Sequence, residues 1–115
     1  MLDSASNRRL FIDFDTYTDG DNDFKKELVV SMVDNLKELS TSVVEAVQQK
    51  QPTIFDKTCH KIKPTLTMLE DPGLQDIINQ TKVQLADNKD MESAIKNITE
   101  VCEQIIKSLE DEIRD

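Results

Sequence analysis

The sequence is poor in the residues that build turns, sheets and metal sites. It contains no tryptophan, a single histidine, two glycines and three prolines among 115 residues. Folds with many strands need many turns, and turns draw on glycine and proline, whereas abundant leucine, isoleucine, valine, glutamate and lysine favour helices. The length suits one hydrophobic core, so we expect a single domain.

Positive charge is also scarce, with 14 Lys and Arg against 23 Asp and Glu and a formal net charge of −9. Nucleic acids and anionic membranes bind basic surfaces, so neither is expected as a partner. The sequence has no apolar run of about 18 residues and no basic segment followed by an apolar one. We therefore expect no membrane span and no signal peptide, and we expect a cytoplasmic location.

Only two cysteines occur, Cys59 and Cys102, and both stand where a helix would bury them. We favour buried free thiols, as is usual in a cytosolic protein, over a disulfide. A metal- or redox-linked function of the two thiols is an alternative. It requires the thiols to be close together and accessible.

One apolar stripe dominates the first half of the chain. Its residues recur at intervals of four and three, which is the pattern of one face of a helix: Phe24, Leu28, Met32, Leu36, Leu39, Val43 and Val47. The stripe predicts a helix of about seven turns that ends near Gln51. Asp21 or Asp23 is its expected N-cap. Additional apolar residues beside the stripe indicate that this helix contacts two neighbours.

Three further helices are predicted after it. The first covers residues 52–70, with Pro52 in its first turn, where a missing N–H costs nothing. The segment Asp71-Pro72-Gly73 separates it from a helix over 74–85, and a polar turn leads to the last helix over 91–113.

Four amphipathic helices with short connections predict an all-α fold, an antiparallel up-down four-helix bundle. We expect residues 21–115 to form this bundle domain. Residues 1–20 are expected to form a short N-terminal helix or extended arm, over 4–18, that packs on one end of the bundle.

The only histidine, His60, lies in the helix over 52–70. The apolar face of that helix is formed by Phe55, Cys59, Ile62, Leu66 and Leu69. His60 falls roughly 140° from the centre of this face, so its side chain is expected to point to solvent. Lys57 and Lys63 flank it at i−3 and i+3, and Lys61 is adjacent.

Most chemistry known for helical bundles is excluded by composition. A di-metal site needs several Glu-x-x-His pairs, and one histidine cannot supply them. Cys59 and His60 diverge by about 100° on a helix, so they cannot share a metal or form a nucleophile–base pair. No glycine-rich phosphate loop is present. We therefore expect no conventional enzyme, no metal site and no cofactor of the chain's own.

An exposed imidazole can nonetheless act as a nucleophile toward phosphorus, because its ordinary pKa lies near 6.5 and it is largely neutral at physiological pH. A phosphohistidine carries close to two negative charges, which Lys57 and Lys63 could offset. In the alternative interpretation, these lysines are simply the solvated face of a helix.

The stretch from His60 to Leu69 resembles the active helix of histidine-containing phosphotransfer (HPt) domains. The family pattern is histidine, any residue, an aliphatic residue, lysine, glycine, a small residue and an apolar position nine after the histidine. His60, Ile62, Lys63, Thr65 and Leu69 match it. The stretch from Gly20 to Leu28 also resembles the start of the family's first long helix, and the likeness covers residues 10–113.

Two positions depart from the family pattern. Pro64 replaces the usual glycine four residues after the histidine, and Glu70 replaces a later glycine. Pro64 has no N–H to donate to the carbonyl of His60, so we expect the helix to bend there.

The resemblance implies that His60 accepts a phosphoryl group from a receiver-domain aspartate and returns it to another. It implies that Lys63, and to a lesser extent Lys57, stabilises that group. Partners would be receiver domains of hybrid histidine kinases and response regulators, which would supply Mg²⁺. Autokinase activity and an ATP site are not expected, and the width of the apolar stripe favours a monomer.

The expected docking surface for receivers comprises Thr53, Lys61, Pro64, Thr67 and Met68. Met68 lies at the edge of the buried stripe and could instead belong to the core. The alternative function is a non-catalytic adaptor, a degenerate phosphotransfer domain that binds receiver or kinase domains without reacting.

Overall fold

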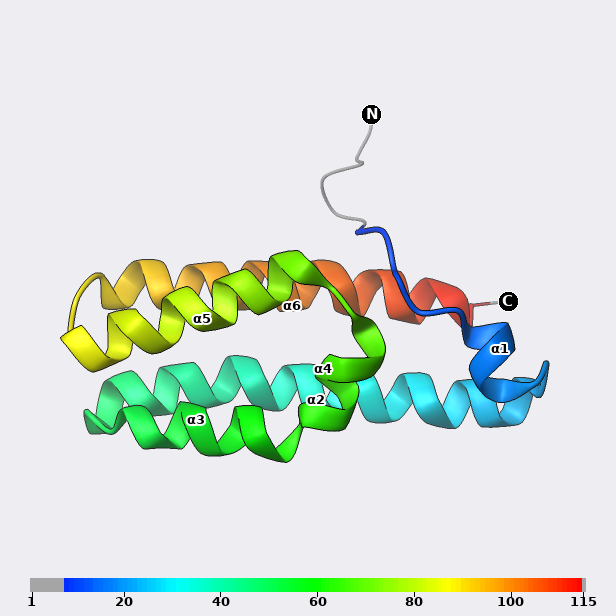
Figure 1. The fold of residues 1–115 in the computed structure, drawn as a ribbon, viewed down its shortest axis with the longest axis horizontal. Coiled ribbons are helices and arrows are strands. Elements are labelled where there is room, and N and C mark those ends of the chain that lie inside the picture. Colours follow the sequence, from blue (N-terminus) through cyan, green and yellow to red (C-terminus); the bar gives the residue numbers. More distant parts are fainter. Residues whose placement is uncertain (1–7, 115) are drawn as a thin grey trace.

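The computed structural model describes residues 8–114, which are all-α, with no strand among them. Figure 1 shows the helices in chain order: α1 (Phe14–Thr18), α2 (Asn22–Gln49), α3 (Pro52–Lys61), α4 (Lys63–Leu69), α5 (Pro72–Asp87) and α6 (Met91–Glu112). None of the helices in this part of the chain is both long enough and apolar enough to cross a membrane.

The four longest helices pack side by side along a body of 45 × 35 × 20 Å. α2 packs against α6 and α3, and α5 packs against α6 and α3. α4 is the short link that leads from the end of α3 to the start of α5 (Figure 1). The histidine helix therefore lies beside both α2 and α5.

The apolar stripe predicted for α2 forms the centre of the core. Met32, Leu36, Leu39 and Val43 are fully buried, as are Phe55 of α3 and a row of residues from α5 and α6 that includes Leu74, Ile78, Ile98, Ile105 and Leu109. Burial of these large side chains is the main favourable term in folding, at about 25 cal/mol per Å² of apolar surface.

Phe24 was predicted to begin that stripe, and this is wrong, because its side chain is 46% exposed. Phe14 of α1 is buried at this end of the core instead. Lys25 faces the Phe14 ring, with Nζ 5.8 Å from the ring centroid. Lys25 follows Phe24 in α2, and successive helical residues differ in direction by about 100°. Because Lys25 points to the Phe14 ring, the side chain of Phe24 is turned toward solvent.

The N-terminal segment combines the two predicted forms, since residues 8–13 are not helical and lead into α1. The part of the expected arm before residue 8 lies outside the described residues. Of the two candidate caps for α2, Asp21 is the N-cap, and its Oδ1 accepts a hydrogen bond from the Phe24 N–H at 3.1 Å.

The single helix predicted over 52–70 is divided in two at Ile62, which has φ −95° and ψ 14°. Pro64 explains the division, because it cannot donate to the carbonyl four residues before it and its ring crowds that carbonyl. The bend expected from Pro64 therefore falls within four residues of His60. Asp71 then caps α5 and Pro72 occupies its first turn, so the segment expected to separate two helices instead begins the second one.

Candidate functional site

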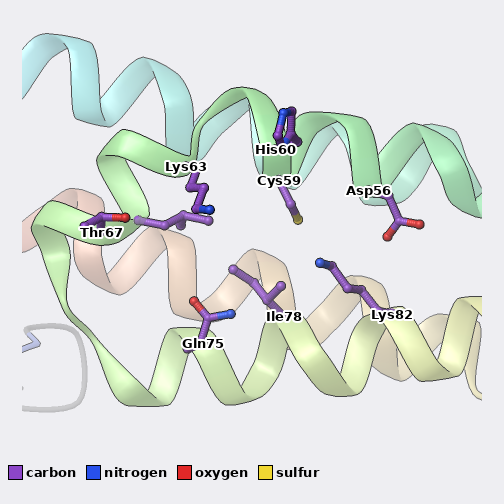
Figure 2. A pocket seen from close by; sticks show the side chains of 9 residues that line it. Asp56, Cys59, His60, Lys63, Thr67, Gln75, Ile78 and Lys82 are labelled. Atoms are coloured by element: carbon purple, nitrogen blue, oxygen red, sulfur yellow. The ribbon is translucent and has the colours of Figure 1, made fainter.

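His60 lies in the last turn of α3, exposed, at the rim of a groove of about 440 Å³ between α3–α4 and α5. Figure 2 shows the side chains that line this groove: Asp56, Cys59, His60, Lys63, Leu66, Thr67, Gln75, Ile78 and Lys82. The histidine is thus at the edge of a concave surface.

Burial of its neighbour sets the direction of His60. Cys59 is only 6% exposed, and its side chain points across the groove toward Ile78 of α5 (Figure 2). Because the next residue is rotated by about 100°, His60 is carried to the rim. Burial raises the pKa of the Cys59 thiol to about 11, so this thiol contributes no charge to the groove at neutral pH.

Lys63 is positioned by the short helix α4, which is anchored on α2. Asn35 Nδ2 of α2 donates to Thr65 Oγ1 of α4 at 2.7 Å, and Thr65 is 3% exposed. Leu69 is buried in the core at the far end of the same helix. These two contacts fix α4, and therefore fix where the Lys63 side chain leaves the backbone.

Of the three lysines predicted to surround His60, only Lys63 lines the groove. Lys61 is directed to α2, where its Nζ lies 2.9 Å from Glu38 Oε2. Lys57 is exposed and lies outside the groove lining. The second cation of the groove is Lys82, which comes from α5.

The sequence did not predict Lys82 and Gln75 as residues of the site. Both share a helical face with Ile78, at spacings of four and three residues, and this spacing is the only sequence signal for them. The spacing places them together on α5 but does not say which helix they face. The same groove contains one carboxylate, Asp56, one turn before His60.

The residues predicted for docking differ in exposure and in whether they line the groove. Thr53, Pro64 and Thr67 are exposed as expected, and Thr67 also lines the groove. Met68 is half-buried and packs against the core, so it falls between its two predicted roles.

Within residues 8–114, no group of three His, Cys, Asp or Glu side chains is arranged to hold a metal ion. Comparisons with protein-family models, with curated proteins and with solved structures found no match for this chain. The groove itself is therefore the basis on which a function can be assigned.

Proposed function

We propose that this protein is a histidine phosphocarrier of a two-component phosphorelay, with an HPt-type fold and His60 as the phosphoacceptor. One observation carries the proposal: the sole histidine of an acidic chain lies exposed at the rim of a groove that also contains Lys63 and Lys82. The proposed donor and acceptor are receiver-domain aspartates.

The transfer needs no base from this chain. A ring nitrogen of neutral His60 attacks the phosphorus of an aspartyl phosphate with its lone pair. The bond between phosphorus and the carboxyl oxygen breaks, and its electron pair returns to the aspartate as carboxylate. The other ring nitrogen keeps its proton. Lys63 offsets the added negative charge, and the reverse step regenerates neutral His60.

The proposed partners, helix arrangement and location follow from the same function. The partners are receiver domains of hybrid histidine kinases and response regulators, and they supply Mg²⁺. We propose that α2, α3, α5 and α6 form an antiparallel up-down four-helix bundle, which their ring of pairwise contacts supports. We further propose a cytoplasmic monomer that has no autokinase activity and that binds over α3, α4 and the adjoining part of α2.

A second candidate is a non-catalytic adaptor that binds receiver or kinase domains. Pro64 favours it, because a proline ring four residues after His60 replaces the glycine of the phosphotransfer pattern, next to the reacting side chain. On this hypothesis the groove and its rim serve only as a docking surface.

The two functions are separated by transfer from receiver domains charged with acetyl phosphate, followed by intact mass. The carrier predicts a gain of one phosphoryl group that is acid-labile and absent in His60→Gln. No gain with several receivers would favour the adaptor. A gain that persists in His60→Gln would assign the phosphoacceptor to another residue.

A further inference from the structure

We propose that Lys82 of α5 is a second ligand of the phosphoryl group on His60 and that Asp56 of α3 opposes it, so that these two side chains set the stability of the phosphorylated form. This inference rests on the proposed function. It deepens that function by assigning opposite roles to two groove residues outside the histidine motif.

The positions of the groove side chains around His60 support these roles. Asp56 and Lys63 lie one turn before and one turn after His60 along the same edge of the groove, and Lys82 reaches into the groove from the opposite side (Figure 2). Side chains three or four residues apart on a helix are neighbours, about 5–6 Å apart at Cβ. A phosphoryl group on His60 that turns into the groove therefore has a carboxylate on one side, Lys63 on the other and Lys82 across from it.

In the described part of the chain, the two groove lysines have no competing ion pair. Within residues 8–114, none of Asp56, Lys63 and Lys82 takes part in a salt bridge within 4.0 Å. Lys61, by contrast, is already paired with Glu38. The two groove lysines can therefore bind an added anion without breaking an existing contact.

The charge balance of the groove also supports opposite roles for Lys82 and Asp56. The other residues that line the groove are uncharged at neutral pH, the Cys59 thiol because burial raises its pKa to about 11: Cys59, Leu66, Thr67, Gln75 and Ile78. The groove thus has two positive charges and one negative charge. A phosphoryl dianion gains from each lysine and loses from Asp56, so removing Asp56 should act in the opposite direction to removing Lys82.

The size of the expected change in the ionisation of the phosphorylated side chain follows from Coulomb's law. A unit charge about 6 Å from the phosphoryl group changes an ionisation that adds one negative charge on the order of threefold in water, and salt screening reduces this to about twofold. The ³¹P shift follows the ionisation of the phosphorylated side chain, and each proton lost adds one negative charge to it. This ionisation reports the local charge directly and needs no receiver.

The experiment charges His60 with phosphoramidate. A ring nitrogen forms the new bond to phosphorus as the P–N bond of phosphoramidate breaks, and the leaving nitrogen departs as ammonia with a proton from water. Titration of the ³¹P shift then gives the pKa of the phosphorylated side chain in the wild type, Lys82→Gln, Lys82→Arg, Asp56→Asn and Lys57→Gln, each first shown by circular dichroism to be folded. Lys57 is the matched control, a lysine one turn from His60 but outside the groove.

We expect Lys82→Gln to raise the pKa of the phosphorylated side chain by about 0.3 unit, the twofold change above, and Asp56→Asn to lower it. Lys82→Arg should retain the wild-type value, and Lys57→Gln should shift it by less than half as much as Lys82→Gln. Equal shifts for Lys57→Gln and Lys82→Gln, or shifts of the same sign for Asp56→Asn and Lys82→Gln, would overturn the inference.

Failure of folded wild-type protein to take up a phosphoryl group from phosphoramidate would also overturn it, because the groove would then not admit the group. A different result would rule out the proposed function but not this inference. In that case phosphoramidate charges His60 and the titrations follow the expected pattern, while receiver domains neither give nor accept the phosphoryl group.

Discussion

Arg8 is bound to Asp71 through two parallel hydrogen bonds, from Nε to Oδ2 at 2.8 Å and from Nη2 to Oδ1 at 2.9 Å. Asp71 is nearly buried, and its Oδ1 also caps α5 by accepting from the Leu74 N–H at 3.0 Å. The backbone N–H of Arg8 donates to Ser108 Oγ, and that hydroxyl donates to the Arg8 carbonyl. One arginine thus joins the N-terminal segment to α5 and α6.

Arg8→Ala should lower the free energy of unfolding by about 2 kcal/mol, because it leaves the Asp71 carboxylate buried without its cation. Urea unfolding at pH 7 measures this. Arg9→Ala is the matched control, since Arg9 is exposed and lies over the exposed Phe11 ring, with Cζ 5.3 Å from the ring centroid. It should change the free energy by less than about 0.5 kcal/mol. Equal effects of the two substitutions would contradict a structural role for the Arg8–Asp71 pair.

The same pair should give stability a dependence on acid pH. Burial of Asp71 acts to raise its pKa, but hydrogen bonds from Arg8 and the Leu74 N–H outweigh burial and hold the pKa below its ordinary value. The stabilisation is complete above the unfolded-state pKa of about 3.9 and is lost as pH falls through the lower folded-state pKa. The difference in unfolding free energy between wild type and Asp71→Asn should therefore shrink below about pH 4. A difference that stays constant down to pH 2 would contradict this cause.

Gly73 lies under the Arg8 guanidinium, and a Cβ on Gly73 would collide with Nη2 of Arg8 and crowd Asp71 Oδ1. Gly73→Ala should therefore destabilise the wild type by displacing Arg8. In an Arg8→Ala background the collision is gone, and alanine should be neutral or stabilising because it favours helix. A double-mutant cycle measured by urea unfolding tests this, and additive effects would show that Arg8 does not occupy this position in solution.

Local features of the structure could be predicted from the sequence, whereas non-local contacts could not. The cap at Asp21, the bend near Pro64 and the outward direction of His60 were predictable, because each depends on residues within about one helical turn. The Arg8–Asp71 pair was not, since 63 residues separate its members and no periodicity relates them.

The candidate site divides in the same way. Lys63 and the rim position of His60 follow from spacing along one helix. Lys82 could not be predicted, because its place in the groove depends on how α5 is rotated against α3. Phe24 fits the helical period, yet it is exposed because Phe14, from a helix the stripe does not include, is buried there instead.

The Asn35–Thr65 hydrogen bond should be the main polar contact that holds α4, and with it Lys63, against α2. Asn35→Ala should lower the free energy of unfolding by about 1 kcal/mol, since it leaves the buried Thr65 hydroxyl without this partner. It should also speed amide hydrogen exchange in α4 more than in α6. Ser31→Ala, at an exposed position on α2, is the control and should do neither. Uniform acceleration of exchange across all helices would mean that Asn35 acts on global stability alone.

The two cysteines provide a test of the core that also bears on the redox alternative. Burial raises the pKa of the Cys59 and Cys102 thiols to about 11 each, from an ordinary value of 9.0. At pH 8 this leaves about 100-fold less thiolate than at an exposed cysteine, and the thiolate is the species that reacts. Both thiols should therefore resist iodoacetamide in the native protein and react fully in urea. Cys59→Ser and Cys102→Ser, labelled separately, would show which thiol is open if one reacts.

The same raised pKa values predict a loss of stability in alkali. Unfolded thiols release their protons near pH 9.0, whereas the buried thiols keep theirs until about pH 11, so the unfolded state binds fewer protons in between and stability falls as pH rises. Replacing both cysteines by alanine should remove this part of the pH dependence. Rapid native labelling of both thiols at pH 8, together with a flat stability profile up to pH 10, would place them outside the core and would revive a redox function for them.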